Sequence, residues 1–355
     1  MLLKKQKGFR KGVLLRRSDF EYVLPPELIA QEPLPRRDES RLLVVRRDRE
    51  EFEHRIFRDI LEYLVPGDLL VVNETKVLPV RLFGVKEGTG GRVELLLLRA
   101  GGNDVWEVLV RPGRRVAPGT RLVFGEGLLR GEVLSRTEAG GRTVRFFYEG
   151  SFEEVLQRVG EVPLPPYVKK KLASPERYQT VYAKEPGSAA APTAGLHFTP
   201  ELLTAVRGRG VAVVPVVLHI GLDTFRPVRV EDITLHRMHR EEYLVPGETA
   251  EAVNRARDEG RRVIAVGTTA VRCLEAAADE KGKVAAGAGA TELFIYPGYR
   301  FKVVDAMLTN FHLPCSTLLM LVAAFAGREK VLRAYGEAVR LRYRFFSFGD
   351  AMLII

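Results

Sequence analysis

The chain has 355 residues, of which 46% are hydrophobic and 28% charged, a composition typical of globular proteins and not of disordered ones. Its formal net charge of +10 favours a polyanionic partner, and nucleic acid is the first class to consider. The two cysteines, Cys273 and Cys315, exclude a disulfide framework and a cysteine-rich zinc site, and they fit a cytoplasmic protein. The longest apolar runs, 211–220 and 317–326, are too short to span a bilayer.

Residues 1–18 form a basic N-terminal extension that lacks the apolar stretch and cleavage site of a secretory signal. The extension is either an arm that contacts phosphates or a segment without a role, and both readings stay open. Residues 19–66 contain several prolines, a predicted strand at 41–47 and a predicted helix at 57–64.

Residues 67–150 differ in character, because short apolar runs alternate there with Gly and Pro turns and no helical periodicity appears. The predicted strands are 69–73, 93–99, 105–112, 120–126, 129–135 and 142–150. Several strands at close, regular spacing predict a small antiparallel β-barrel-like inserted domain over residues 67–150.

In residues 151–355 predicted helices and strands alternate. The helices are 152–160, 201–210, 248–260, 268–278 and 316–327, and the strands are 211–220, 261–267 and 291–299, the last ending in a turn. The Ala/Gly stretch 282–290 is expected to be a flexible loop. This alternation predicts a mostly parallel sheet with helices around it, so that residues 19–66 and 151–355 form one α/β catalytic domain.

His197 lies between a Thr-Ala-Gly turn and a predicted helix start at Thr199, where Thr is a good N-cap and the following Pro suits the first turn. Small residues such as Gly195 allow the backbone to approach a ligand closely. His197 therefore faces a site at this helix N-terminus, or it is a core histidine bonded to the backbone, and both readings stay open.

His219 stands at the carboxyl end of the predicted buried strand 211–220, before a loop that holds Thr224 and Arg226. Ligands of open α/β sheets bind outside the carboxyl ends of the strands, which predicts that His219 lines a site. The alternative is a strand-end histidine that caps the loop.

His236 and His239 would share one face of a helix and hold a metal ion there. Their surroundings match neither the His-Glu-x-x-His zinc helix nor the Glu-x-x-His of di-iron bundles, so no metal site is predicted. Glu241 or Glu242 is instead predicted to accept hydrogen bonds from ribose hydroxyls or an ammonium group.

The strand–Gly–Thr–Thr–helix pattern around Thr268 and Thr269 offers free backbone N–H groups and two hydroxyls, which suits an anion. Asn310 and His312 precede the apolar helix predicted from residue 316. Together these clusters predict one pocket at one edge of a sheet.

Nine stretches, taken in order, resemble the S-adenosylmethionine:tRNA ribosyltransferase-isomerase family of queuosine biosynthesis, the QueA family. They are DFEYVLPPELIAQEPLPRRDESRLLVV, GDLLVVNETKVLPVRLFG, GEVPLPPY followed by ERYQTVYA, APTAGLHFT, HIGLDTFRPV, HRMHREEY, VIAVGTTAVRCLE, PGYRFKVVDAMLTNFHLPCSTLLMLVAAF and FGDAML. The resemblance implies transfer of the ribosyl part of S-adenosylmethionine to a 7-aminomethyl-7-deazaguanine at the tRNA wobble position. It further implies rearrangement to epoxyqueuosine with release of adenine and methionine.

The resemblance also gives the polar residues of these motifs their expected roles. His197 and His219 are the candidate catalytic residues, because removal of a proton beside the sulfonium needs a base of near-neutral pKa. The candidate substrate-binding residues are Thr193, Gly195, Thr224, Arg226, Glu241, Thr268, Thr269, Arg272, Asn310 and His312. Among them, the Thr268–Thr269 turn and Arg272 are expected to bind the methionine carboxylate, and Glu241 or Glu242 its ammonium group.

The implied partners are S-adenosylmethionine, which is consumed, and tRNA with a GUN anticodon; no metal, further cofactor or membrane is implied, and a monomer is expected. Asp223 stands where a Gly is expected, which leaves the behaviour of that loop open. Two other classes remain as alternatives: a non-catalytic RNA-binding protein, and an S-adenosylmethionine methyltransferase, although the Gly-rich first turn of the latter is not evident.

Overall fold

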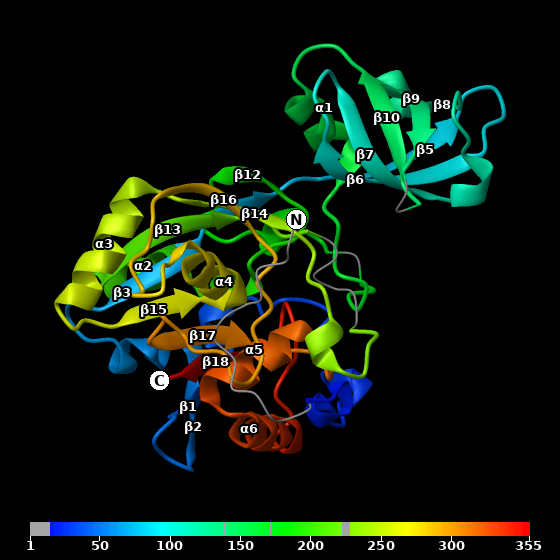
Figure 1. The fold of residues 1–355 in the computed structure, drawn as a ribbon. Helices are drawn as coiled ribbons and strands as arrows, with labels where there is room; N and C mark the ends of the chain where they lie inside the picture. The colour runs from blue at the N-terminus through cyan, green and yellow to red at the C-terminus, as the bar shows by residue number, and fades with distance from the viewer. Residues whose placement is uncertain (1–14, 138–139, 171, 222–227) are drawn as a thin grey trace. The chain divides into compact units, whose positions relative to one another are not determined.

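The computed structural model describes residues 15–137, 140–170, 172–221 and 228–355, which fold into two compact units (Figure 1). The larger unit comprises the described residues up to 76 together with 166–185 and 191–355. The smaller unit comprises 77–165 and 186–190. The short strands β4 (Thr75–Val77) and β12 (Glu185–Ser188) pair where the chain passes between the units.

The smaller unit is a closed six-stranded antiparallel barrel. Its strands, in spatial order, are β5 (Arg81–Lys86), β6 (Arg92–Ala100), β7 (Val105–Arg111), β10 (Arg142–Phe147), β9 (Leu129–Arg136) and β8 (Arg121–Phe124). Pairing of β5 with β8 closes the barrel, and β11 (Gly160–Glu161) pairs with Arg81 and Leu82 at the start of β5. A Cβ at Gly84 would lie 2.4 Å from the Val123 carbonyl oxygen, so closure at this point requires glycine.

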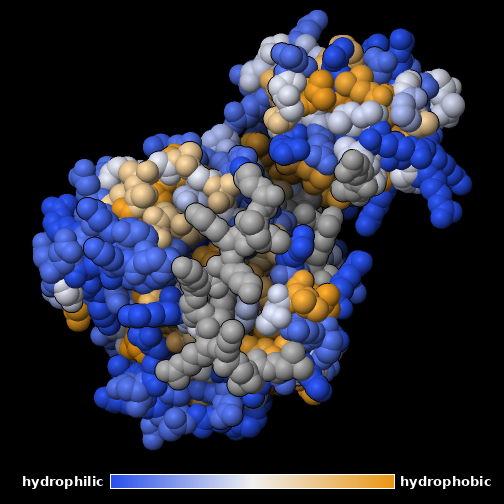
Figure 2. Space-filling view, viewed as in Figure 1, coloured by the Kyte–Doolittle hydropathy of each residue, from blue (hydrophilic) through white to orange (hydrophobic). Residues whose placement is uncertain are grey.

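Alternation along the strands explains the barrel interior, because every second side chain points inward. The buried core includes Leu82, Val93, Leu95, Val108, Leu122, Leu129, Val133 and Val144. Helix α1 (Phe152–Val159) packs its Val155 and Leu156 into this same core. The outer face of the barrel is partly apolar (Figure 2), and its exposed large side chains are Phe83, Val85, Leu98, Leu128, Leu134 and Phe147.

The predicted antiparallel barrel is confirmed, but its extent differs from the predicted segment 67–150 at both ends. Residues 69–73 are strand β3 (Leu69–Asn73) of the larger unit, where all five residues are buried. An unbroken apolar run is typical of a strand buried on both faces. Such a run does not indicate which sheet the strand joins. At the other end, α1 belongs to the barrel unit, because its apolar face is buried in the barrel core.

The larger unit is built on a nine-stranded mixed sheet. Its spatial order is β16 (Gly287–Thr291), β14 (Glu241–Val245), β13 (Ala212–Leu218), β3, β15 (Val263–Val266), β17 (Ala306–Asn310), β18 (Ala351–Ile354), β1 (Arg41–Val45) and β2 (Phe52–Ile56). The four central strands β13, β3, β15 and β17 run parallel, as do β18 and β1. The other pairings are antiparallel, so the sheet is mixed and the prediction of a mostly parallel sheet holds only for its centre.

Helices cover this sheet and complete its core (Figure 1). The 3-10 helix η4 (Phe57–Tyr63) and α2 (Pro200–Gly208) share one core with alternate residues of the central strands, among them Leu70 and Ile264. Helix α4 (Gly267–Ala277) packs on β3, β13, β15 and β17. The remaining helices are α3 (Gly247–Asp258), α5 (Thr317–Ala326) and α6 (Arg328–Arg340).

Two local predictions in the larger unit are wrong. The stretch 282–290, expected as a flexible loop, contributes most of β16, which pairs with β14, while the stretch 291–299, expected as a strand ending in a turn, carries no strand after Thr291. A Gly/Ala run has weak intrinsic strand preference, so its extended form depends on the pairing partner. In the parts of the chain that are described, no helix combines the length and the apolarity that crossing a membrane requires.

Candidate functional site

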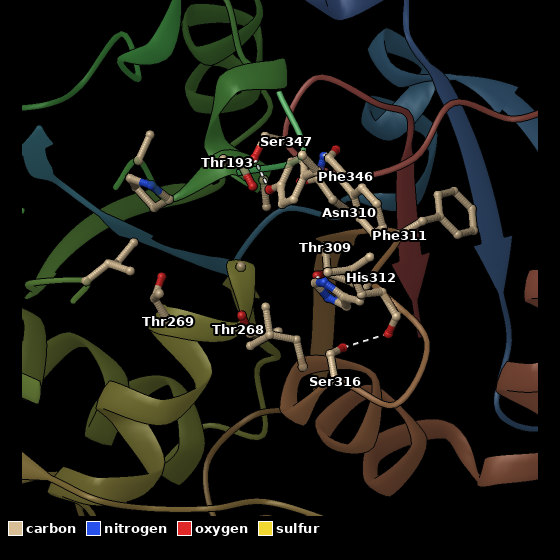
Figure 3. A pocket seen from close by; sticks show the side chains of 18 of the residues that line it. Thr193, Thr268, Thr269, Thr309, Asn310, Phe311, His312, Ser316, Phe346 and Ser347 are labelled. Atoms are coloured by element: carbon tan, nitrogen blue, oxygen red, sulfur yellow. Dashed lines mark hydrogen bonds between the residues drawn. The ribbon is translucent and has the colours of Figure 1, made fainter. Parts of the chain in front are cut away.

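A cavity of about 290 Å³ lies in the larger unit, beyond the carboxyl ends of β15 and β17 (Figure 3). Its walls are Tyr167, residues 191–194, Ile220, residues 267–269, residues 309–316, Leu318, Phe346 and Ser347. Because β17 and β18 are antiparallel, the segment before β18 meets the end of β17 at this same edge. A cavity at the carboxyl ends of parallel strands is where open α/β sheets bind small molecules.

One wall is the first turn of α4, which begins directly where β15 ends. Gly267 has φ +88°, a left-handed conformation that favours glycine and turns the strand sharply into the helix. No side chain caps the first N–H groups of this helix, within the residues that the structure describes. The Thr269 hydroxyl is buried and, among those same residues, without a hydrogen-bond partner. With Thr268 beside it (Figure 3), this turn presents donors that suit a negatively charged group.

A second wall is the end of β17, which carries Thr309, Asn310 and His312. The Thr309 hydroxyl lies 2.9 Å from His312 Nε2, and the His312 backbone N–H donates to the Tyr335 hydroxyl at 3.0 Å. Burial lowers the pKa of His312 to about 3, so this ring is neutral at physiological pH. His312 is therefore a neutral polar side chain in the wall of the cavity.

Aromatic side chains form a third wall. The rings of Tyr167 and Phe346 lie 4.7 Å apart between centroids, and Phe311 follows Asn310 in the same wall. The Tyr167 hydroxyl lies 2.7 Å from Ser347 Oγ, and burial raises the pKa of Tyr167 to about 12. Apolar ring faces beside a few fixed polar groups are typical of sites that bind heterocyclic molecules.

His197 lies behind the wall and is fully buried. Its ring stacks on Phe57 with centroids 4.8 Å apart, and its Nδ1 lies 2.6 Å from Ser40 Oγ and 3.3 Å from Arg37 Nη2. Its Nε2 lies 3.2 Å from Nδ2 of Asn310. Burial lowers the pKa of His197 well below 6.5, and the neighbouring Arg37 charge lowers it further. The core reading thus describes its burial, while Asn310 connects it to the cavity.

His219 lies directly before the wall residue Ile220 and is half-buried. Its Nδ1 lies 2.9 Å from Thr75 Oγ1, and its backbone N–H donates to the Glu242 carbonyl at 3.0 Å. Burial lowers the pKa of His219, which therefore is neutral at pH 7 and able to accept a proton. The remaining predicted residues of the loop, Thr224 and Arg226, lie outside the described residues together with Asp223.

Thr193 and Gly195 belong to the 3-10 helix η8 (Thr193–His197), but they face different surroundings. Thr193 lines the cavity. A Cβ at Gly195 would lie 1.9 Å from the Tyr182 hydroxyl and 2.9 Å from Thr180 Cγ2. Glycine is therefore required at this position by close packing against Tyr182, and not by approach to a ligand.

Arg272 and Glu241 bind each other. The Arg272 guanidinium donates to the Glu241 carboxylate, and both side chains are buried. Arg272 Nε also donates to the Leu293 carbonyl at 3.1 Å, while His239 Nε2 lies 3.1 Å from Glu241 Oε1. Each of the two side chains therefore already has a charged partner, and the carboxylate and ammonium roles stay predictions.

The helix required for the metal hypothesis at His236 and His239 does not form. Both histidines follow the short 3-10 helix η10 (Ile233–Leu235), and strand β14 starts at Glu241. Within the described residues, no group of three or more His, Cys, Asp or Glu side chains is arranged to hold a metal ion.

The structure adds residues that the sequence did not single out. Arg37 and Ser40 lie directly before β1 and reach His197, while Phe346 and Ser347 lie directly before the FGDAML motif. Their position beside that motif is the signal by which Phe346 and Ser347 could have been identified from the sequence. Arg37 and Ser40 lie within the first of the nine family stretches, but nothing there indicated His197 as their partner, because the contact of Ser40 with His197 spans 157 residues of sequence.

Comparison with known proteins identifies the family to which the chain belongs. The family model described as Queuosine biosynthesis protein matches residues 17–354. The chain belongs to the queuosine biosynthesis protein family. A relative from Pelotomaculum thermopropionicum, named S-adenosylmethionine:tRNA ribosyltransferase-isomerase, is 66% identical over 338 residues, which are 95% of this chain and 99% of that protein. One of the same name from Carboxydothermus hydrogenoformans is 62% identical over 341 residues, 96% of this chain and 100% of that protein.

A solved member of this queuosine biosynthesis family has the same fold. The crystal structure of S-adenosylmethionine tRNA ribosyltransferase from Thermotoga maritima is 44% identical in sequence and matches with a TM-score of 0.54. The match covers 95% of this chain and 100% of that chain. The family resemblance inferred from the sequence motifs is therefore confirmed over nearly the whole chain.

Proposed function

We propose that this chain is an S-adenosylmethionine:tRNA ribosyltransferase-isomerase of queuosine biosynthesis. It transfers the ribosyl part of S-adenosylmethionine to 7-aminomethyl-7-deazaguanine in tRNA and isomerises it, giving epoxyqueuosine with release of adenine and methionine. The observation that carries this proposal is the identity of 57–66% to several proteins of that name, each matched over nearly the full length of both chains.

The cavity suits the first substrate. S-adenosylmethionine has an anionic carboxylate, amino groups and a planar purine, which correspond to an uncapped helix start, buried acceptors and aromatic faces. We assign the first turn of α4, with Thr268 and Thr269, to the methionine carboxylate, because no side chain caps this helix start among the described residues. We assign the aromatic wall of Tyr167 and Phe346 to a heterocyclic ring.

The reaction begins at a carbon next to the positive sulfur, where loss of a proton leaves a stabilised carbanion. A neutral imidazole is a suitable acceptor for that proton. Of the two histidines predicted as catalysts, we assign this role to His219, because it is half-buried, directly precedes the cavity residue Ile220 in the chain and is neutral at pH 7. His197 lacks access to substrate, since it is fully buried behind Asn310.

The proposed function also has a proposed RNA partner, cellular location and oligomeric state. We propose that the tRNA carries a GUN anticodon with the modified base at the wobble position, and that the enzyme acts in the cytoplasm as a monomer. The net charge of +10 supports binding of a polyanion such as tRNA. S-adenosylmethionine is consumed as a substrate in this scheme, and the scheme uses no further cofactor.

One assay separates the candidate functions. The protein is incubated with S-adenosylmethionine and tRNA that bears the aminomethyl-deazaguanine, and the small-molecule products are measured. Release of adenine together with methionine is the expected result. Release of S-adenosylhomocysteine would indicate a methyltransferase, and binding of tRNA without either product would indicate a non-catalytic RNA-binding protein.

A further inference from the structure

Asn310, at the end of β17, has its side-chain amide between the cavity and the buried His197. The residue is only 3% exposed and lines the cavity. Its Nδ2 donates to the Phe346 carbonyl at 3.0 Å and lies 3.2 Å from His197 Nε2. Its Oδ1 is buried and, across the described part of the chain, without a hydrogen-bond partner. The amide thus uses both of its hydrogens on the protein and leaves its acceptor unused.

The Phe346 carbonyl fixes which way this amide points. A carbonyl oxygen only accepts, so the amide atom 3.0 Å away must be the nitrogen. In the reversed orientation, two acceptor oxygens would face each other at that distance. The oxygen of Asn310 is therefore the free atom, and an unpaired buried acceptor is costly unless a ligand supplies a donor.

His197 supports the same orientation. Its ring is neutral and carries one hydrogen, and because Nε2 accepts from Asn310, that hydrogen is on Nδ1. Nδ1 then donates to Ser40 Oγ at 2.6 Å, and the Ser40 hydroxyl donates to the Arg37 carbonyl at 3.0 Å. Each link from the Arg37 carbonyl oxygen through Ser40 and His197 to Asn310 Nδ2 then pairs one donor with one acceptor.

The Arg37 guanidinium helps to keep the ring neutral. It is buried, and it donates to the Leu196 and Phe348 carbonyls at 3.4 and 3.1 Å. Its Nη2 lies 3.3 Å from His197 Nδ1, so its positive charge opposes a second proton on the ring; the tautomer itself is set by the Phe346 carbonyl through Asn310, and not by Arg37. A protonated ring would present a donor to the Asn310 Nδ2 donor and break this series of hydrogen bonds.

We propose that Asn310 is a specificity-determining residue whose amide oxygen accepts a hydrogen bond from a primary amino group of the substrate. We further propose that His197 is a positioning residue that holds the amide in this orientation, with Ser40 and Arg37 behind it. This inference rests on the proposed function. Two substrates of that reaction carry such a group: S-adenosylmethionine has an ammonium and an adenine amino group, and the modified base has its aminomethyl group.

The first test replaces the acceptor. Asn310→Ala is expected to raise the KM for the substrate that supplies the amino group by roughly tenfold or more, the usual effect of losing a buried hydrogen bond. A rise in the KM for S-adenosylmethionine identifies that molecule as the donor, and a rise in the KM for tRNA identifies the modified base. An unchanged KM for both substrates, in an enzyme that still releases adenine, would overturn the proposal. The control is Asn254→Ala, a half-buried asparagine of α3 that binds only the Val284 backbone among the described residues, for which both KM values should stay unchanged.

The second test asks whether His197 acts through Asn310. His197→Leu keeps most of the side-chain volume and removes both ring nitrogens, so it should raise the same KM as Asn310→Ala. In the Asn310→Ala background the same substitution should add nothing, because the residue that it positions is gone. Effects that multiply in the double variant would show a purely structural role and would overturn the positioning part.

A third variant tests the same positioning role if His197→Leu fails to fold. Ser40→Ala removes the acceptor of the Nδ1 hydrogen and is expected to raise the same KM less strongly, again with no effect in the Asn310→Ala background. Failure of the proposed function is recognised separately, because the wild-type protein would then release no adenine at all.

Discussion

The Arg272 guanidinium and the Glu241 carboxylate form a buried ion pair that joins the second turn of α4 to the first residue of β14. Their side chains are 4% and 1% exposed, so neither charge is compensated by water. β14 joins the parallel centre of the sheet through its antiparallel pairing with β13, and α4 begins at the cavity. The pair therefore fixes the helix whose first turn we assign to the substrate carboxylate.

Glu241→Ala is expected to lower the free energy of unfolding by about 3–5 kcal/mol, because it leaves a buried guanidinium without its counter-ion. Arg272→Ala should cost a similar amount. The double variant should cost clearly less than the sum, since no unpaired charge remains buried. Urea unfolding of the four proteins measures these differences, and strict additivity would contradict a direct pair.

His312 predicts a dependence of stability on pH. Its pKa is about 3 in the folded protein and 6.5 as a model value for an exposed ring. Below pH 6.5 the unfolded chain therefore binds a proton that the folded protein does not, and stability is lost as the pH falls toward 3. This group contributes a slope of roughly 1.4 kcal/mol per pH unit. Urea unfolding at several pH values between 6.5 and 4.5 should show a shallower slope for His312→Gln than for the wild type, and equal slopes would contradict the assignment.

Gly195 predicts a packing defect that can be tested without substrate. Gly195→Ala places a Cβ against the Tyr182 hydroxyl and Thr180, and it is expected to destabilise the protein by about 1–3 kcal/mol. The matched control is Gly208→Ala near the end of α2, where no heavy atom lies within 4 Å of the added Cβ and the substitution should be neutral or slightly stabilising. Thermal unfolding of both variants gives the comparison. Equal melting temperatures would argue against close packing at Gly195.

His219→Ala tests proton transfer. We expect kcat to fall by roughly 10²–10⁴-fold, the usual contribution of a general base, with stability changed by less than about 1 kcal/mol. Because the pKa of His219 is lowered by burial, wild-type kcat should stay high at neutral pH and fall only when acid protonates the ring. The variant should lose that acidic limb of the profile. A large fall in melting temperature with kcat retained would instead return His219 to a structural role, and exposed His54→Ala is the activity control.

Local chemistry accounts for what the sequence predicted well. Thr199 caps α2 by accepting from the Leu202 N–H at 3.2 Å, and Ser316 caps α5 in the same way at Leu319. Such signals need only neighbouring residues, so the helix starts were readable. The regular spacing of short apolar runs between Gly and Pro turns likewise predicted five of the six barrel strands, all except β5.

Long-range pairing accounts for what the sequence left out. The Gly/Ala strand β16 exists because β14 pairs with it, and β3 joined a different sheet from the one that its position suggested. The state of His197 depends on Arg37 and Ser40, which approach it through the fold. A histidine beside a helix cap was visible in the sequence, while its burial behind Asn310 required the assembled sheet.

The position of strand β18 near the C-terminus affects the order in which the protein folds during synthesis. It lies inside the nine-stranded sheet, where it pairs with β17 on one side and β1 on the other. During synthesis from the N-terminus, β1 and β2 leave the ribosome early but lack their link to the sheet until residues 351–354 emerge. The barrel, whose strands all lie between residues 81 and 161, can close long before that. The enzyme's cavity, which needs Phe346 and Ser347, is therefore among the last parts to form on a nascent chain.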